Sequence, residues 1–270
     1  MWDTETVPLS TEERVAAAVR LMPSTTEARR TQGTEEWVRT RLGFSPDILQ
    51  EKVLVSESTR VLLNCTRQWG KSTVTAAKAV HQAQTKAGSL TLVMSPSARQ
   101  SGEFLRKAAG FVRKLGMRAM GDGDNEVSLA FPNGSRIVGL PGSEATVRGF
   151  SAVSLLLVDE AARVSDELYL SVRPMLAVSG GALWLMSTPF GKRGFFYKAW
   201  ESGSGWERIR VTADECSRIR KDFLEEERAT MGERWFRQEY LCEFTDVNSG
   251  VFDADLVARA VSNEVGVLEI

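Results

Sequence analysis

The stretch Asn64-Cys65-Thr66-Arg67-Gln68-Trp69-Gly70-Lys71-Ser72-Thr73 decides the fold of this chain. It follows the apolar run Val61–Leu63 and leads into a helix-forming run that begins at Val74. A strand, a loop that ends in Gly-Lys-Ser and a helix, in this order, are the context of a phosphate-binding P-loop. We therefore expect a site for nucleotide phosphates at the junction of this strand and this helix.

The residue types of the loop suit a triphosphate that binds together with a metal ion. Backbone N–H groups and the helix N-terminus form a cradle for anions, Lys71 neutralises the β- and γ-phosphates, and Ser72 can ligate Mg²⁺. Cys65 stands where the consensus has its first glycine. Arg67 either contacts the γ-phosphate or forms a surface ion pair, and its place inside the loop favours the phosphate. Trp69 is a candidate for packing over the nucleotide. The loop residues that we expect to bind ATP are Arg67, Gln68, Trp69, Gly70, Lys71, Ser72 and Thr73.

The composition of the 270 residues is that of an ordinary globular protein, with 43% hydrophobic and 26% charged residues and a formal net charge of −1. This charge argues against a globally basic protein but leaves local basic patches open. The three cysteines lack metal-ligand spacing and indicate a reducing compartment. The sequence has neither a secretory signal nor an apolar run that approaches the roughly 20 residues of a membrane span. We therefore expect a cytoplasmic protein.

Short apolar strands alternate with helices after Val53. We expect strands at Arg60–Asn64, Leu90–Met94, Ser154–Val158, Leu183–Ser187 and Trp206–Val211, and helices at Ser72–Lys86, Ser97–Leu115, Asp166–Leu176 and Phe195–Trp200. The Asn-Gly turn within Pro132–Ser135 indicates a hairpin, and Ser217–Glu243 reads as helical. Nearly continuous apolar strands are typical of a parallel sheet covered on both faces. The expected fold class is α/β: a three-layer P-loop NTPase with a mainly parallel central sheet and a small helical lid.

Another apolar strand ends in two acids, Asp159 and Glu160. Such acids at a strand end can simply be solvated, but together with a P-loop they fit a Walker B motif. Asp159 would hold Mg²⁺ opposite Ser72, and Glu160 would activate the attacking water as a general base. The stretch of chain between Lys71 and Asp159 is long enough for intervening strands, as in P-loop ATPases of the additional-strand, RecA-like type.

A further apolar strand ends in Ser187-Thr188-Pro189. Hydroxyl groups at the carboxyl end of a strand beside the P-loop can sense the γ-phosphate through hydrogen bonds. A plain strand-to-turn junction could have the same sequence. The Ser-Thr-Pro segment is informative because it follows the P-loop and the Asp-Glu pair in this order.

The three motifs in this order, with an arginine inside the P-loop, resemble the large terminase subunit of tailed bacteriophages, the viral DNA-packaging motor. The resemblance runs from about residue 40 to residue 255. Gly43–Gln50 is similar to the adenine-binding segment of that family, and Thr146–Phe150 is similar to its Arg-Gly element. Ser187–Pro189 is similar to its coupling motif. Trp235–Phe244 is similar to its Arg-Gln-Glu-Tyr-Leu stretch, and Gly250–Phe252 to the entry into its linker.

The resemblance implies a Mg²⁺-dependent ATPase that translocates double-stranded DNA into a procapsid. It implies that Gln50 contacts adenine, that Thr188 couples hydrolysis to lid motion, and that Arg148 acts as an arginine finger rather than as a solvated charge. Thr188 and Arg148, together with Glu160 and Arg67, make up the expected catalytic set. The implied partners are double-stranded DNA, a homo-oligomeric ring on a portal and a small terminase subunit, with no membrane, in the host cytoplasm.

We expect an N-terminal helical or lid segment over residues 1–50, an ATPase core over 51–200, lid and C-terminal helices over 201–250, and a linker over 251–270. Large terminases usually continue into a nuclease domain. No constellation of acids remains here for two-metal chemistry, so we expect no nuclease activity from this chain.

Basic residues crowd one expected helix and its entry: Arg99, Arg106, Lys107, Arg113 and Lys114. They either contact DNA phosphates without reading sequence or form a solvated face. Two rival functions stay open. A helicase-like DNA-dependent ATPase would need a second RecA-like domain or a partner chain. A catalytically silent DNA-binding or assembly protein is disfavoured by the intact Lys71, Asp159 and Glu160.

Overall fold

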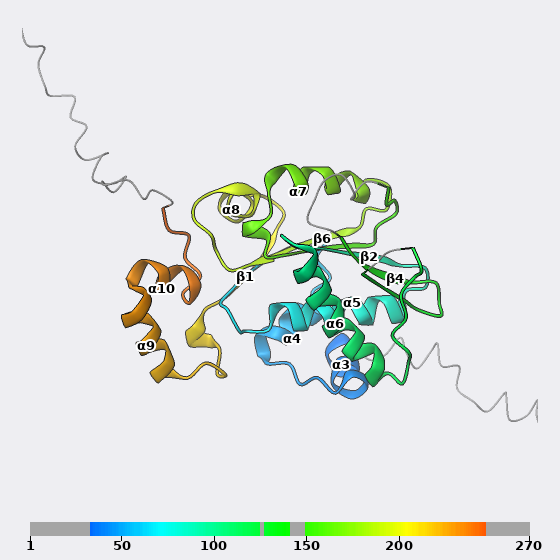
Figure 1. Ribbon diagram of the computed structural model, residues 1–270, viewed down its shortest axis with the longest axis horizontal. Coiled ribbons are helices and arrows are strands. Elements are labelled where there is room, and N and C mark those ends of the chain that lie inside the picture. The colour runs from blue at the N-terminus through cyan, green and yellow to red at the C-terminus, as the bar shows by residue number, and fades with distance from the viewer. Residues whose placement is uncertain (1–32, 125–126, 141–148, 247–270) are drawn as a thin grey trace, which may run out of the picture.

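A seven-stranded sheet forms the centre of the computed structural model, which describes residues 33–124, 127–140 and 149–246 (Figure 1). The strand order is β3-β4-β2-β5-β6-β1-β7. Neighbouring strands are parallel except β3 and β4, which run antiparallel as the predicted hairpin. The strands are β1 (Arg60–Cys65), β2 (Leu90–Met94), β3 (Ser128–Ala130), β4 (Arg136–Gly139), β5 (Leu155–Asp159), β6 (Ala182–Ser187) and β7 (Glu207–Val211).

Helices cover both faces of this sheet (Figure 1). One face carries α3 (Thr34–Leu42), α4 (Ile48–Val55), α5 (Lys71–Thr85) and α6 (Ala98–Lys114), and the other carries α7 (Asp166–Val172) and α8 (Gly194–Ser202). Short 3-10 turns lie at η2 (Ala161–Arg163), η3 (Arg173–Leu176) and η4 (Ala213–Glu215). The three-layer α/β fold class is therefore confirmed.

The strands are buried on both sides, as their apolar sequences predicted. In β5, Leu155 and Leu157 pack into the core beneath α5 and α6, whereas Leu156 and Val158 pack into the core beneath α7 and α8. Successive side chains of a strand point to opposite faces, so a strand that feeds two cores must be apolar at every position. This is the reason why the sequence shows continuous apolar runs instead of alternation.

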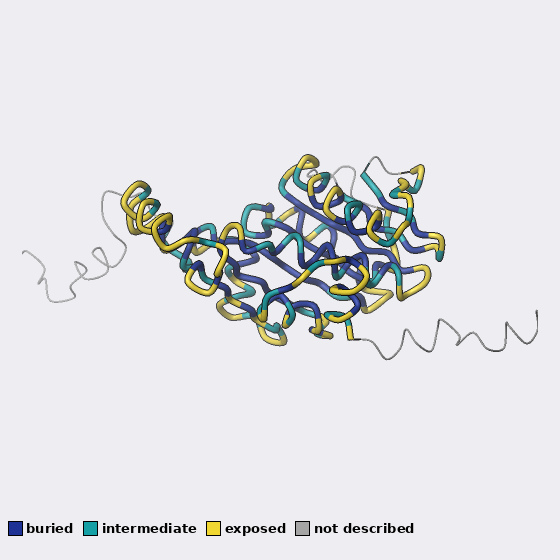
Figure 2. The backbone as a smooth tube through the Cα atoms, turned by 90° about the horizontal axis from the view of Figure 1, so that it is seen from below, coloured by how far each residue is buried: buried dark blue, intermediate teal, exposed yellow. Residues whose placement is uncertain are grey.

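Two helices, α9 (Lys221–Met231) and α10 (Glu233–Glu239), project from one end of the molecule. Figure 2 shows them as a largely exposed extension of the body. With Ala213 of η4 they form a small apolar cluster that includes Leu224, Phe236 and Tyr240. Gly232, with φ of 79°, separates the two helices and breaks the continuous helical stretch that we expected over Ser217–Glu243.

Most predicted elements are present within a residue or two of the expected ends. The helix expected at Asp166–Leu176 divides into α7 and η3, since Pro174 cannot donate the backbone hydrogen bond of a regular helix. Helix α4 was not expected; it is capped at its N-terminus by Asp47, whose side chain accepts a hydrogen bond from the Gln50 backbone N–H. Helices α3 and α4 pack mainly on α5 and α6. The domain boundaries expected from the sequence stay predictions.

In the described part of the chain, none of the helices combines the length and apolar character that crossing a bilayer requires.

His81, the single histidine, predicts a specific loss of stability in mild acid. Its ring packs edge-on against Trp37 with the centroids 4.9 Å apart, and burial, aided by Lys78 and Lys86, lowers its pKa to about 4. Between pH 6.5 and 4 the unfolded chain therefore binds more protons than the folded one, so the free energy of unfolding falls as the pH falls.

His81→Phe keeps an aromatic ring but does not titrate. When the pH falls from about 7 to about 5, we expect its free energy of unfolding to fall by about 1–2 kcal/mol less than that of the wild type. Urea unfolding of both proteins at several pH values measures the difference. Parallel stability curves for the two proteins would contradict a buried neutral His81.

Candidate active site

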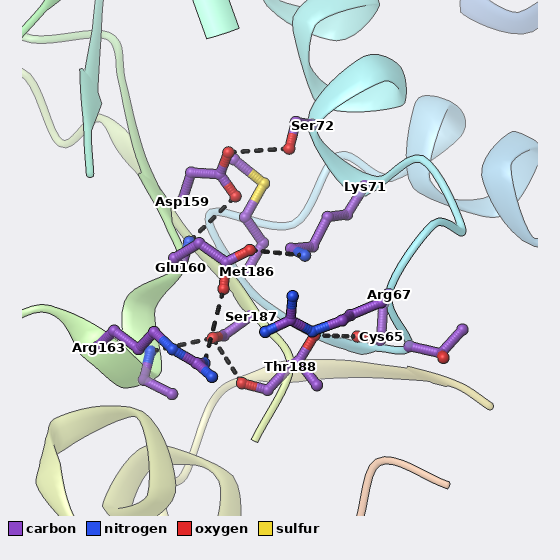
Figure 3. Close-up of polar contacts among 12 residues, drawn as sticks. Cys65, Arg67, Lys71, Ser72, Asp159, Glu160, Arg163, Met186, Ser187 and Thr188 are labelled. Atoms are coloured by element: carbon purple, nitrogen blue, oxygen red, sulfur yellow. Dashed lines mark hydrogen bonds and ion pairs between the residues drawn. The ribbon is translucent and has the colours of Figure 1, made fainter. Parts of the chain in front are cut away.

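The carboxyl ends of three neighbouring strands form the candidate site (Figure 3). Strand β6 lies between β1 and β5, with Asn64 opposite Ser187 and Met186 opposite Asp159. Because parallel strands end at the same edge, this register brings the P-loop, the acid pair and the Ser-Thr-Pro segment together. One strand between the P-loop strand and the Walker B strand is the arrangement expected of the additional-strand type.

Gly70 sets the backbone of the P-loop at the start of α5. Its φ of 96° is in the region that favours glycine, and its carbonyl accepts hydrogen bonds from the Thr73 and Val74 N–H groups at 2.9 and 3.0 Å. An added Cβ at this position would lie 3.1 Å from Nε2 of Gln50. The loop can therefore turn directly into the helix N-terminus, where free N–H groups favour an anion.

Lys71 is a buried cation whose charge is balanced by two acids. Its Nζ lies 2.9 Å from Oε1 of Glu160. Burial favours the neutral amine, but the charges of Glu160 and Asp159 outweigh it and raise the pKa of Lys71 above its ordinary value. The ammonium group is therefore charged at neutral pH.

Ser72 and Asp159 form a pair of oxygen donors that fits Mg²⁺. The Ser72 hydroxyl donates to Oδ2 of Asp159 at 2.8 Å. Burial raises the pKa of Asp159, while Lys71 and the Ser72 hydrogen bond oppose that shift. A hydroxyl and a carboxylate are among the hard oxygen ligands that Mg²⁺ uses when phosphate and water complete its shell.

Glu160 has a strained backbone, with φ of 52°. Its N–H donates to Oδ1 of Asp159 at 3.0 Å, and its carbonyl accepts from the N–H of Arg163 at 2.8 Å. Left-handed backbone at a residue other than glycine persists where surrounding contacts fix it, and it is concentrated at functional sites. Here it turns the carboxylate of Glu160 toward Lys71 (Figure 3).

Arg67 forms an ion pair in this structure, the alternative that the sequence analysis disfavoured. Its Nε donates to Oε2 of Glu239 in α10. The same carboxylate lies 3.4 Å from Nη2 of Arg163, and the Glu239 backbone carbonyl accepts from the Thr66 hydroxyl at 3.2 Å. More than half of the Arg67 side chain is exposed to solvent, and Arg67 lines the pocket described below.

The Ser-Thr-Pro segment is hydrogen-bonded to both other motifs. Thr188 Oγ1 donates to the Cys65 carbonyl at 3.1 Å, at the start of the P-loop. Ser187 Oγ accepts from the N–H of Ala162 at 3.2 Å, just after the acid pair. Both side chains are buried, so a displacement of this segment would move the P-loop and the Walker B end with it.

A pocket of about 680 Å³ opens over the P-loop. All seven predicted loop residues line it, with Glu160 and with Gln50. The Gln50 amide donates to the Trp69 carbonyl at 2.9 Å, and an adenine contact by Gln50 stays a prediction. The Trp69 side chain, a candidate for packing over the nucleotide, is fully buried in the core, and that role stays a prediction.

Four charged residues of the site were missed or given another role. Arg218 lines the pocket and donates to the Trp69 carbonyl, and Lys107, expected to contact DNA, lines the same pocket. Glu239 and Arg163 bridge the motifs. Glu239 lies within the Arg-Gln-Glu-Tyr-Leu stretch and Arg163 three residues after Glu160, which were the available signals. Arg148, the expected finger, lies outside the described residues, as do residues 250–252.

Comparison with known proteins identifies relatives of the whole site region. The family described as terminase large subunit, T4likevirus-type, N-terminal, matches residues 62–259. The large terminase subunit of Escherichia phage T5 is 24% identical over 169 residues, which are 60% of this chain and 39% of that protein. The chain thus spans well under half the length of this curated relative.

Solved structures share the fold at low identity. The ATPase domain of the Thermus phage P74-26 large terminase superposes with a TM-score of 0.70 at 20% identity, over 79% of this chain and 100% of that one. The large terminase of bacteriophage HK97 gives 0.66 at 14% identity, over 82% and 56%. The large terminase of a thermophilic bacteriophage, solved in complex with ADP, gives 0.61 at 14% identity, over 83% and 54%. Since the family match covers most of its length, the chain belongs to the large terminase subunits of bacteriophages.

Proposed function

We propose that this chain is the ATP-hydrolysing motor domain of a phage large terminase, which translocates double-stranded DNA into a procapsid. The observation that carries the proposal is the convergence of Lys71, Ser72, Asp159 and Glu160 on one edge of the sheet. Family membership and terminase ATPase neighbours, one of them solved with ADP, support it.

The P-loop would bind the triphosphate. The loop residues and the start of α5 line the pocket, and Lys71 supplies a positive charge there. Arg67 and Lys107 add cations at the rim. Ser72 and Asp159 would hold Mg²⁺, which would offset the negative charge that develops on the phosphate groups.

Glu160 would act as the general base for the attacking water. Its carboxylate lines the pocket next to Lys71. A positioned base of this kind contributes about 10²–10⁴-fold to the rate of a proton transfer.

Helices α9 and α10, the proposed lid, would follow the state of the site through the contacts of α10 and of the segment after it with the core. Gln238 Oε1 accepts from the Gly191 N–H at 3.1 Å, and the Cys242 carbonyl accepts from the Asn64 amide at 2.9 Å. With the Glu239 contacts to Arg67, these bonds connect the lid to the P-loop and to the end of the Ser-Thr-Pro segment. Thr188 would couple hydrolysis to motion of this lid.

The proposed partners are DNA, a homo-oligomeric ring on a portal, and a small terminase subunit. A stripe on α6 is suited to DNA phosphates. Arg99, Arg106 and Arg113 are exposed and seven residues apart, so they lie two turns apart on one helix face. The other two predicted contacts are engaged elsewhere, because Lys107 lines the pocket and Lys114 reaches the Gly43 carbonyl.

Glu160→Gln should bind ATP but hydrolyse it at least about 100-fold more slowly, because the amide cannot accept the proton of water. Steady-state ATPase assays and binding of the slowly hydrolysed analogue ATPγS separate the two effects. Lys71→Ala serves as the control that loses binding. Normal turnover by Glu160→Gln would refute the assignment of the base.

Arg148→Ala tests whether the site is completed by a neighbouring chain. If Arg148 is a finger in trans, ATPase activity per wild-type chain should rise with protein concentration, and the variant should lose up to about 10³-fold. Hydrolysis measured over a concentration series gives the answer. Activity per chain that stays constant would assign Arg148 to a cis or structural role.

Replacing the stripe arginines, Arg99, Arg106 and Arg113, by glutamine should weaken DNA binding. If each contacts one phosphate, the slope of log K against log salt should shrink by about 2.7. Fluorescence anisotropy with duplex DNA at several salt concentrations measures the slope. Arg173→Gln with Lys198→Gln, exposed charges on the α7 and α8 face, is the matched control. An unchanged slope would mean that the stripe is a solvated face.

A further inference from the structure

Five charged residues form a chain of alternating sign across the site. Reading from the P-loop, they are Arg67, Glu239, Arg163, Glu160 and Lys71. Each carboxylate is shared by two cations, and Arg163 alone contacts both acids: Nη2 lies 3.4 Å from Glu239, and Nη1 lies 4.0 Å from Oε2 of Glu160. The two end cations, Arg67 and Lys71, line the pocket, but Arg163 does not.

A bound triphosphate competes for both end cations. The lysine of a P-loop pairs with the β- and γ-phosphates. A bound phosphate would therefore weaken the close contact between Lys71 and Glu160. Of the described cations that contact Glu160, Arg163 is the one that does not line the pocket. It is therefore the counter-ion that Glu160 keeps when phosphate engages Lys71.

Arg163 has an unused donor for this purpose. Its Nη1 is buried and has no hydrogen-bond partner among the described residues. A shift of about 1 Å would bring Nη1 from its 4.0 Å separation to hydrogen-bond distance of Glu160 Oε2. A buried donor without a partner is unfavourable, so the local structure favours this movement.

Packing holds the Arg163 guanidinium in place. It lies over the ring of Phe190, 4.4 Å from the centroid, directly after the Ser-Thr-Pro segment. Arg193 stacks on the same ring at 4.5 Å but has no described contact with Glu160. Phe190 and Glu239 thus limit the guanidinium to a small pivot about Nη2, and this pivot carries Nη1 toward Glu160.

We infer that Arg163 is a positioning residue, which holds the Glu160 carboxylate toward the attacking water once phosphate takes Lys71. This inference rests on the proposed ATPase function. Arg163 itself touches neither nucleotide nor water in this assignment, so its loss affects the chemical step and not nucleotide binding.

The test compares Arg163→Gln with the matched control Arg193→Gln, which removes the second arginine from the same ring. We expect kcat of Arg163→Gln to fall at least about 10-fold, with the KM for ATP and the affinity for ATPγS within about 3-fold of wild type. Arg163→Lys, which keeps the charge, should recover part of the loss, and Arg193→Gln should match the wild type. Thermal melts verify that each variant is folded, and Arg163→Lys and Phe190→Leu replace Arg163→Gln if it is not.

A double-mutant cycle shows whether Arg163 acts through Glu160. In a Glu160→Gln background, adding Arg163→Gln should leave the residual turnover unchanged, because the group that it positions is gone. A further fall in that background, or a rise in KM that parallels the fall in kcat, would show direct contact with the phosphates and overturn the inference. Wild-type turnover by Arg163→Gln would also overturn it while leaving the proposed ATPase intact. Absence of activity in the wild type itself would remove the proposed function and the inference together.

Discussion

The rest of the site depends on one buried cation, Lys71. An ammonium group in the interior is strongly destabilised unless opposite charge accompanies it, and here the end of β5 supplies that charge through Asp159 and Glu160. The acids can do so only because β6 places β5 at the correct distance from β1. The order of the strands and the charge balance of the P-loop are therefore a single constraint.

The same constraint extends to the proposed lid, α9 and α10. These helices share a small apolar cluster with Ala213 of η4 and project from the body. Polar contacts of Gln238, Glu239 and Cys242 with the core connect them to it. Apolar packing tolerates small displacements poorly, whereas polar contacts can exchange partners. Helices whose contacts to the core include charged and hydrogen-bonding groups could follow the charge state of the pocket by exchanging those partners.

Local sequence patterns were sufficient for the fold and for the arrangement of the central motifs. The apolar runs at β1, β2, β5 and β6 predict buried parallel strands because each must fill two cores. Lys71, Ser72, Asp159 and Glu160 lie in short stretches whose spacing fixes their chemistry, and the structure brings them together. Their catalytic roles await the experiments above.

What the sequence could not supply depends on contacts between distant segments. An aromatic residue inside a loop can face either the ligand or the core, and only the fit beneath α5 decides that Trp69 is buried. Arg67 pairs with Glu239, 172 residues further along the chain, and no local pattern specifies that partner. The continuous helix expected after Ser217 ignored Gly232, whose positive φ of 79° ends α9 and lets α10 begin in a new direction.

The alternating charge chain explains why these long-range pairs belong together. A row of three cations and two carboxylates carries one excess positive charge, and each acid is shared between two neighbours. Phosphate groups at the two ends would draw Arg67 and Lys71 toward the pocket and leave both acids to the central guanidinium. Because Glu239 lies in α10 and Glu160 directly after β5, a single rearrangement of ion pairs would reach the acid pair and α10 at once. An arginine suits the central position better than a lysine, since its planar fork can donate to two carboxylates while its face lies on Phe190.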